Sequence, residues 1–298
     1  MGLKGSLCLL LASFIWGITF VAQLVGMDNI GPFTYGFSRF AVGVAAILPV
    51  WYFFHRRQDR TSSRYSPGWK AGMGAGVIMF TASAFQQCAM QYTTAGKTAF
   101  ITCLYIIFVP ILSIIIGRIV RTENWLGAIL ALAGLYCLSV KGDFSLNYGD
   151  VLAFVCSILW SIHIMYIGRF AAQKDNMEIS TAQLIVCTAL NGIFAFATEN
   201  VVFQDILDAW FPIVFAGVMS SGIAFTLQIV GQKYAEPAHA AIIMSLESVF
   251  GALGGWLIIN EQMMSIEIFG CILMLLGMLV TQGRIILKHN WHSSGTVG

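Results

Sequence analysis

The sequence predicts an all-α integral membrane protein with ten transmembrane helices, and three observations support this fold class. First, 58% of the 298 residues are hydrophobic and only 10% are charged, whereas soluble domains carry about 25% charged residues. Second, the chain contains long apolar runs of the length that a membrane-crossing helix needs, about 20 residues. Third, positive charge gathers in alternate links between these runs. So few charges cannot cover the surface of a soluble fold, and a net charge of +2 without a concentrated basic face argues against a nucleic-acid partner.

The apolar runs define the expected helices and the short links between them. They cover residues 5–26, 31–54, 69–91, 97–117, 123–140, 149–169, 179–198, 209–231, 238–259 and 265–284. The spans of a β-barrel would be shorter and would alternate apolar with polar residues. These runs are longer and do not alternate in this way. Helices are also favoured because a span in lipid must satisfy its own backbone hydrogen bonds.

Lysine and arginine determine the expected orientation, because cytoplasmic links carry an excess of both. With a cytoplasmic N-terminus, the inner segments hold Lys4; Arg56, Arg57, Arg60, Arg64 and Lys70; Arg118 and Arg121; Arg169 and Lys174; Lys233; Arg284 and Lys288. The outer links hold only Lys97 and Lys141, and their acidic residues are Asp28, Asp143, Glu199, Asp205 and Asp208. Both ends of the chain are therefore expected on the cytoplasmic side of the cytoplasmic (inner) membrane.

The chain also matches itself at a shift of about 143 residues. SFIW at Ser13–Trp16 returns as SILW at Ser157–Trp160, and QQCAMQY at Gln86–Tyr92 returns as QIVGQKY at Gln228–Tyr234. Gly127 and Gly134 likewise return as Gly270 and Gly277. We therefore expect two repeats of five helices each, at residues 1–142 and 143–284, followed by a polar cytoplasmic tail at 285–298. An odd number of spans per repeat inverts the second repeat, an arrangement typical of secondary transporters.

Several motifs resemble the drug/metabolite transporter superfamily, of the ten-helix EamA type. The motifs are WGITFVAQ (Trp16–Gln23), GPFTYGFSRF (Gly31–Phe40), YTTAGKTAFIT (Tyr92–Thr102), YAEPAHAAIIMSLESVF (Tyr234–Phe250) and, most specific, SLESVFGALGGWLIINE (Ser245–Glu261). The resemblance implies export or exchange of small metabolites, often amino acids, and covers both halves of the chain. Ser248 and Asn260 depart from it, because the family usually has proline and glycine there; without the proline, no kink after Glu247 is predicted.

Glu247 and Arg39 are the ionisable residues that lie deepest in the expected spans. Counting 1.5 Å per residue, Glu247 lies ~15 Å past Pro237 and Arg39 ~11 Å past Pro32, so the two side chains are at similar depth and could pair. A charged group at this depth is costly and usually faces the protein interior. Burial disfavours the charged form of a carboxyl group, so Glu247 is a candidate for proton binding. The alternatives are a purely structural hydrogen bond for Glu247 and snorkelling to the headgroups for Arg39.

Further polar and aromatic residues within the spans complete the candidate site. The candidate substrate-binding residues are Trp16, Thr19, Gln23, Arg39, Gln86, Gln87, Tyr105, Trp160, His163, Gln183, Gln228 and Glu247. His163, the repeat counterpart of Thr19, is the second candidate for proton coupling. Amides suit the orientation of a zwitterionic or polar substrate, although each of these residues could instead be a packing group. No metal-ligand spacing or cofactor motif occurs, and all seven cysteines fall in apolar runs as small core residues.

Three functions remain open on the sequence. The favoured one is a secondary transporter of small polar metabolites by alternating access, possibly coupled to protons, with the lipid bilayer and a small-molecule substrate as its partners. An intramembrane enzyme is disfavoured because GxSxG and HExxH motifs are absent. A non-transporting scaffold or sensor is disfavoured because the links are too short to form an output domain. The glycine pairs Gly72/Gly76 and Gly251/Gly255 favour packing within a monomer over a homodimer seam.

Overall fold

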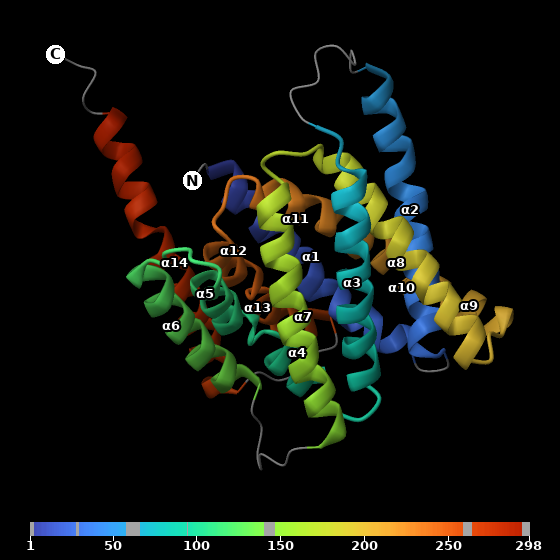
Figure 1. Cartoon of the computed structure of the whole chain (residues 1–298). Helices are drawn as coiled ribbons and strands as arrows, with labels where there is room; N and C mark the ends of the chain where they lie inside the picture. Colours follow the sequence, from blue (N-terminus) through green and yellow to red (C-terminus); the bar gives the residue numbers. More distant parts are fainter. Residues whose placement is uncertain are drawn as a thin grey trace.

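The computed structural model describes residues 3–27, 30–57, 66–93, 95–139, 147–258 and 264–293. Within these ranges the regular structure is helical, and the only β-type contact is an isolated bridge between Ser66 and Lys174. The helices form one bundle (Figure 1), in which α1 begins and α14 ends on the same side as the end of α2. The predicted all-α class is therefore confirmed for the described part of the chain.

The helices, with their bounds, are as follows. They are α1 (Leu3–Gly26), α2 (Pro32–Arg57), α3 (Trp69–Ala89), α4 (Ala95–Thr102), α5 (Tyr105–Ile115), α6 (Thr122–Ser139), α7 (Tyr148–Phe170), α8 (Asn176–Thr198), α9 (Phe203–Asp208), α10 (Trp210–Phe215), the π-helix η1 (Ala216–Ala224), α11 (Phe225–Gln232), α12 (Pro237–Met244), α13 (Glu247–Ile258) and α14 (Ser265–Ser293).

Six helical segments of the described chain are long and apolar enough to cross a membrane. They are Pro32–Phe53, Thr98–Ile115, Tyr148–Phe170, Asn176–Thr198, Trp210–Gln232 and Pro237–Gly254. Three shorter apolar helices accompany them, at Leu3–Thr19, Thr122–Leu138 and Ser265–Thr281. The prediction of a multi-pass membrane protein is therefore confirmed.

Three of the expected continuous spans are wrong in detail, because each is interrupted. The span predicted at 97–117 is divided between α4 and α5, and the span at 238–259 between α12 and α13. The span at 209–231 passes from α10 through η1 into α11, and the link before it contains the short helix α9. The interruption after Met244 lies immediately before Glu247, whereas α13 (Glu247–Ile258) is continuous, so no break follows Glu247, as expected where Ser248 replaces proline.

Local hydrogen bonding explains the two interruptions at α4–α5 and α12–α13. The Ser245 hydroxyl donates to the Ile242 carbonyl (2.8 Å), and the Leu246 amide bonds to the Ile243 carbonyl, only three residues back (3.2 Å). The Leu104 amide makes the equivalent bond to the Ile101 carbonyl (3.1 Å). Such tight turns replace the α-helical pattern and are typical of functional hinges. A break therefore forms at Ser245 although position 248 holds serine and not proline.

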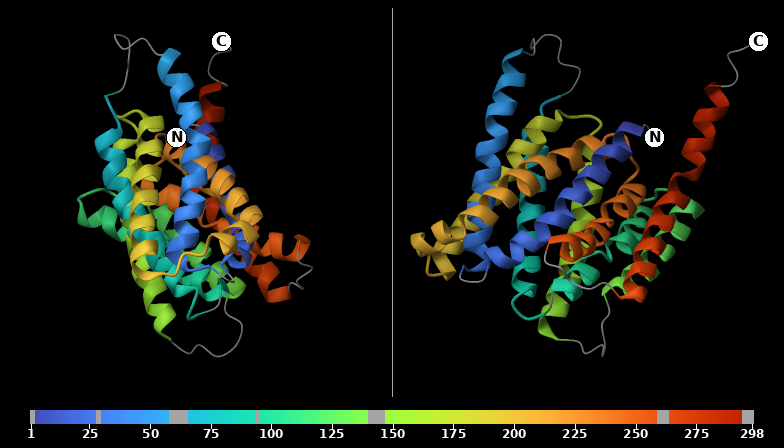
Figure 2. Two further views of the ribbon diagram at one scale, coloured as in Figure 1. Left: turned by 90° about the vertical axis from the view of Figure 1, so that its right-hand side faces the viewer. Right: turned by 180° about the vertical axis from the view of Figure 1, so that it is seen from behind.

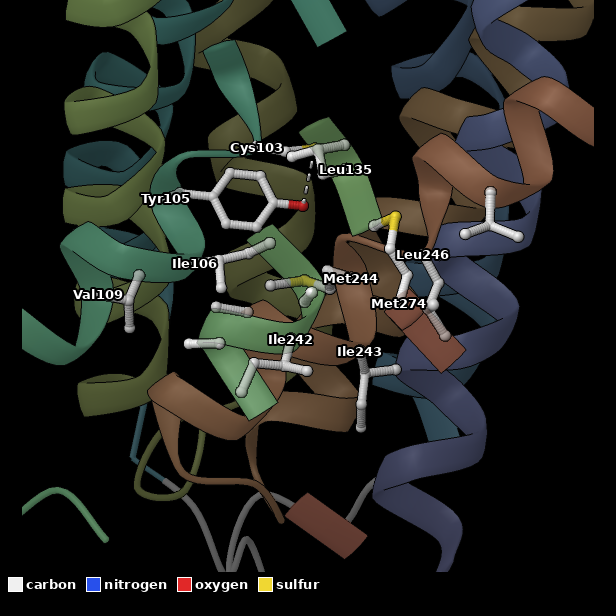
Figure 3. Packing of buried hydrophobic residues seen from close by; sticks show 14 of the residues in the cluster. Cys103, Tyr105, Ile106, Val109, Leu135, Ile242, Ile243, Met244, Leu246 and Met274 are labelled. Atoms are coloured by element: carbon white, nitrogen blue, oxygen red, sulfur yellow. Dashed lines mark hydrogen bonds between the residues drawn. The ribbon is translucent and has the colours of Figure 1, made fainter. Parts of the chain in front are cut away.

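The two interruptions lie inside the main apolar core. Figure 3 shows Cys103 and Tyr105 at the first interruption facing Met244 and Leu246 at the second. Side chains from α5, α6, α12 and α14 fill the space around them, and Ile106 and Leu135 are fully buried. The core therefore holds both broken helices against each other.

Glycines allow the closest helix contacts. α6 and α14 pack along their length, side by side in Figures 1 and 2. A Cβ atom added at Gly127 would lie 2.7 Å from the Gly277 carbonyl oxygen, and one added at Gly134 would collide with the Gly270 carbonyl. Small residues permit such close approach of helix backbones in membranes. The sequence-detected glycines therefore pack within the chain.

Glu199 links the C-terminal end of α8 to the beginning of α2. Its carboxylate accepts hydrogen bonds from the amides of Phe33 (2.9 Å) and Thr34 (2.8 Å) and from the Thr34 hydroxyl (2.6 Å). These amides belong to the first turn of α2, which has no partners for them within the helix. Glu199 was predicted only as an acidic residue of an outer link; the structure gives it the role of a helix cap from a distant part of the chain.

Part of the predicted charge pattern lies outside the described residues. Asp28, Arg60, Arg64, Lys141 and Asp143 fall there, as do the side chains of Arg56, Arg57, Lys97, Arg284 and Lys288. Asn260 and Glu261, at the end of the last motif, also lie outside the described residues. The described part of the inner pattern includes Lys4, Lys70 and Arg118, whose side chains are exposed.

We predict that Gly134→Ala destabilises the protein, because the added methyl group meets the backbone of α14 rather than a side chain that can move. Overpacking of this kind costs roughly 1–3 kcal/mol. The midpoint of thermal unfolding in detergent should fall. Gly254→Ala is the matched control, since its nearest neighbour would be the Ile18 Cα at 4.0 Å. Equal midpoints for the two variants would contradict this account of the α6–α14 contact.

Candidate functional site

A central cavity lies where the interrupted helices meet the remaining bundle. Its volume is about 60 Å³, which is room for a few water molecules. The lining residues are Trp16, Gln23, Arg39, Gln86, Thr102, Tyr105, Trp160, Ile164, Ser220, Phe225, Gln228, Met244 and Glu247. They come from α1, α2, α3, α4, α5, α7, η1, α11, α12 and α13. The cavity is therefore built by both halves of the chain.

Glu247 enters the cavity from the first residue of α13 and contacts the opposite helix break. Its Oε1 atom accepts a hydrogen bond from the Tyr105 hydroxyl (3.2 Å) and from the Cys103 thiol (3.5 Å). The Cys103 sulfur also lies 3.3 Å from the Ser248 hydroxyl. Tyr105 is itself the first residue of α5. The hydrogen bond between Tyr105 and Glu247 thus joins the two interruptions, and each partner is the first residue after its interruption.

Arg39 enters the cavity from α2 and is buried, with 4% of its surface exposed. Its Nη1 atom donates to Gln23 Oε1 (2.8 Å), and Gln23 Oε1 also accepts from Gln87 Nε2 (3.0 Å). The guanidinium carbon lies 4.5 Å from the ring centre of Phe40 and 5.7 Å from that of Tyr35, which allows cation–π attraction. Arg39 is therefore held by an amide and two aromatic rings.

The predicted ion pair between Arg39 and Glu247 is wrong. Among the described residues, neither side chain forms a salt bridge; Arg39 contacts Gln23, and Glu247 contacts Tyr105. Similar depth along two helices does not place two side chains side by side, because each helix occupies its own position in the plane of the membrane. Both groups nevertheless line the same cavity.

Aromatic rings form one wall of the cavity. Trp160 stacks on Phe225 with ring centres 5.9 Å apart, and Trp16 meets the edge of the same ring at 5.1 Å. Phe225 is the first residue of α11, directly after the π-helix. The wall is apolar and lies within the same cavity as the charged groups.

Four of the predicted site residues do not line the cavity. The Thr19 hydroxyl donates to its own helix backbone at Ile15 (2.9 Å), and Gln87 lies behind Gln23 as a supporting donor. His163 Nε2 is 3.2 Å from Gln183 Oε1, and both side chains are fully buried. The roles of all the predicted residues in binding substrate, and of His163 and Glu247 in proton coupling, stay predictions.

Sequence reasoning missed several lining residues. They are Thr102, Ile164, Ser220, Phe225 and Met244. Apolar side chains in apolar spans carry no feature that separates a cavity wall from packing. Thr102 and Met244 each end the first segment of an interrupted helix, and these interruptions were not predicted from the sequence.

Several polar atoms of the cavity residues are buried and unpartnered. Trp16 Nε1, Arg39 Nε and Gln228 Oε1 have no hydrogen-bond partner in the part of the chain that the structure describes. Leaving such groups unpaired costs about 1–3 kcal/mol each, so a polar ligand or ordered water that bonded to them would be favoured. The same part of the chain holds no cluster of three or more His, Cys, Asp or Glu residues that could bind a metal ion.

Comparison with known families decides the class of this site. The sequence model of the EamA-like transporter family matches the chain twice, at residues 3–140 and 147–282. The chain belongs to the EamA-like transporter family. The resemblance predicted from the motifs is therefore confirmed, and membership in the EamA-like family makes the chain a membrane transporter, a class whose members are generally not enzymes.

Relatives of this EamA-like transporter agree with that assignment. An uncharacterized transporter of Archaeoglobus fulgidus is 27% identical over 286 residues, covering 95% of this chain and 87% of the relative. The uncharacterized transporter YoaV of Bacillus subtilis is 21% identical over 288 residues, covering 93% of this chain and 96% of its own. A crystal structure of another protein has a TM-score of 0.78 at 19% identity and covers 94% of this chain and 96% of the other, which shows the shared fold alone.

We predict that Gln23→Leu destabilises the protein in the absence of substrate, because one amide oxygen accepts from both Arg39 and Gln87. Removing an acceptor from buried donors costs roughly 1–3 kcal/mol. The measurement is the midpoint of thermal unfolding in detergent. Gln86→Leu is the control, since Gln86 lines the same cavity and makes no side-chain hydrogen bond to any described residue. A lower midpoint for Gln86→Leu than for Gln23→Leu would contradict the assignment.

Proposed function

We propose that the protein is a secondary transporter, an exporter or exchanger, that moves small zwitterionic metabolites such as amino acids across the cytoplasmic membrane by alternating access. The observation that carries this proposal is one cavity with a guanidinium and a carboxyl group that do not pair with each other. Arg39 and Glu247 both line it, and their side-chain partners within the described chain are neutral groups.

The chemistry of an amino acid matches these two groups. A carboxylate can bind the guanidinium of Arg39 in the planar, forked geometry that arginine favours. An ammonium group can bind the carboxylate of Glu247. The aromatic wall of Trp16, Trp160 and Phe225 would contact an apolar side chain of the substrate. The unpaired Trp16 Nε1 could donate, and the unpaired Gln228 Oε1 could accept, a further hydrogen bond.

Ten spans in two inverted repeats are part of the proposal, and several observations support it. The family matches each half separately. Gly127 faces Gly277, which is the repeat counterpart of Gly134, and Gly134 faces Gly270, which is the repeat counterpart of Gly127. A two-fold relation between the repeats requires this exchange. Both fourth spans are interrupted, and the residues after the interruptions, Tyr105 and Glu247, are repeat counterparts.

The interruptions suggest how the cavity could open to one side at a time. An interruption separates α4 from α5 and α12 from α13, so one pair of segments could move while the other pair stays packed. The hydrogen bond between Tyr105 and Glu247 holds the interruptions together. Protonation of Glu247, or binding of a substrate ammonium to it, would change that bond and couple the movement to protons or substrate.

We predict that Glu247→Gln inserts and folds but loses the pH dependence of transport. The amide keeps the shape and can still accept from Tyr105, whereas it cannot titrate. The measurement is uptake of radiolabelled L-amino acids by liposomes that contain only this protein, across a range of pH. Asp205→Asn, at an acid of the short helix α9 outside the cavity, is the control and should keep the wild-type profile.

An unchanged pH profile in Glu247→Gln would refute the proton role of this carboxyl group. Failure of the variant to insert would instead identify Glu247 as a structural tie between α5 and α13. If no amino acid enters the liposomes with wild-type protein, the substrate class is wrong.

We also predict opposite membrane sides for two described links. In a background lacking the seven native cysteines, Ser66→Cys before α3 and Gln204→Cys in α9 would each carry one exposed thiol. A membrane-impermeant thiol reagent added to whole cells should label the cysteine at position 204 and leave the one at position 66 unlabelled. The reverse pattern would overturn the orientation inferred from lysine and arginine.

A further inference from the structure

A second, larger cavity lies at the end of the bundle where α5 ends and α6 begins. Its volume is about 430 Å³. The lining residues include Arg118, Arg121, Glu123, Lys233, Glu236 and His239. In the proposed orientation this end faces the cytoplasm. None of the residues predicted as substrate-binding lines this cavity.

The side-chain charges of this second cavity favour an anion. Arg118, Arg121 and Lys233 line it together with Glu123 and Glu236. Arg121 and Glu236 form an exposed ion pair at 3.7 Å and so neutralise each other. The remaining charges sum to one positive unit. Two helices, α6 and α12, begin here and three, α5, α7 and α11, end here, so the helix dipoles largely oppose one another and add no attraction for an anion; the attraction comes from the side chains.

The second cavity is separated from the central cavity by about one helical turn. On α7, Gly168 lines the second cavity and Ile164 the central one. On α11, Gln232 lines the second cavity and Gln228 the central one. Residues four apart lie on the same face of a helix, about 6 Å along its axis. The same two helices therefore form walls of both cavities.

Gln232 closes the partition between the two cavities. Its Nε2 atom donates to the Ile164 carbonyl oxygen (3.0 Å), which ties α11 to α7 between the cavities. Its Oε1 atom and His239 Nε2 are buried and have no hydrogen-bond partner within the described ranges. Both side chains are more than nine-tenths buried and line the second cavity. As a donor, His239 Nε2 can bond to a carboxylate oxygen, and Gln232 Oε1 can accept from an N–H or O–H of a ligand, so these atoms indicate a place where a polar ligand would be stabilised.

We propose that the second cavity is a binding site for the carboxylate group of small organic anions and zwitterions, and that it serves as the cytoplasmic antechamber of the transport path. Arg118 is the principal cation, because its side chain makes no ion pair or hydrogen bond with any described residue. A ligand held here reaches the central cavity when the contact between Gln232 and Ile164 opens. The role as antechamber rests on the proposed transport function, whereas the anion site does not.

Succinate, a small dicarboxylate, is the probe for the site. With wild-type protein in nanodiscs of phosphatidylcholine, succinate should raise the midpoint of thermal unfolding, compared with sodium chloride of equal ionic strength. Arg118→Gln should raise the succinate concentration for half the effect about tenfold, the loss expected for a charge-assisted hydrogen bond. Lys70→Gln removes an exposed cation of the same helical end outside the cavity and should leave that concentration unchanged.

A second variant keeps the test decisive if Arg118→Gln does not fold. Ala172 is exposed and lines the cavity, so Ala172→Glu should fold and should abolish the effect of succinate by adding a negative charge. Absence of stabilisation in the wild type, or equal losses in Arg118→Gln and Lys70→Gln, would overturn the anion site. Nanodiscs with phosphatidylglycerol distinguish a lipid phosphate: if this lipid alone stabilises the protein through Arg118 and succinate has no effect in either lipid, the assignment to free carboxylates is wrong.

The route is tested separately by the liposome uptake described for Glu247→Gln. Arg118→Gln should raise the KM for an L-amino acid supplied to the Arg118 side and leave the maximal rate unchanged. A normal succinate site with an unchanged KM would refute the antechamber but not transport. Lack of any amino acid uptake by the wild type would refute the proposed function, while the succinate measurement would still decide the anion site.

Discussion

The hydrogen bond between Tyr105 and Glu247 is the contact on which the arrangement of the site depends. It joins two helices that both break inside the apolar core, and it uses the first residue after each break. Broken helices leave backbone groups without their usual partners, and lipid offers none. The breaks are tolerated because they face each other and the protein interior. The same break places the carboxyl group of Glu247, the first residue of α13, in the central cavity.

The burial of Arg39 follows the same principle by different means. An unpaired charge in a membrane is expensive, and arginine is suited to such a place because its charge is delocalised and its face can lie against aromatic rings. Gln23, Phe40 and Tyr35 satisfy part of its requirement, and Gln87 fixes the orientation of Gln23. The guanidinium is thus held in place but not neutralised. A site with these properties favours the binding of an anionic group of a ligand.

The sequence predicted the helical class and most helix positions because the bilayer imposes a length and an apolar composition on every span. It did not predict the interruptions at Cys103 and Ser245, since these depend on hydrogen bonds of three-residue spacing that many serine-containing helices do not form. Polar residues in apolar spans were found as a class, and Gln86, Gln228 and Glu247 share one cavity. Thr19 and His163 do not line it, because the presence of a polar residue does not reveal whether it faces a cavity, a neighbouring helix or its own backbone. Phe225 was missed because its apolar ring resembles any packing residue.

The cap that Glu199 provides has a mechanical consequence. Glu199 lies at the end of α8, and its carboxylate holds the first turn of α2, the helix that carries Arg39 two turns further on. These hydrogen bonds tie the end of α8 to the beginning of α2, so a displacement of α8 at this end would pull on α2. A movement of the C-terminal end of α8 would therefore act on the first turn of α2 through three hydrogen bonds. Glu199 thereby ties the helix that carries Arg39 to a distant part of the chain.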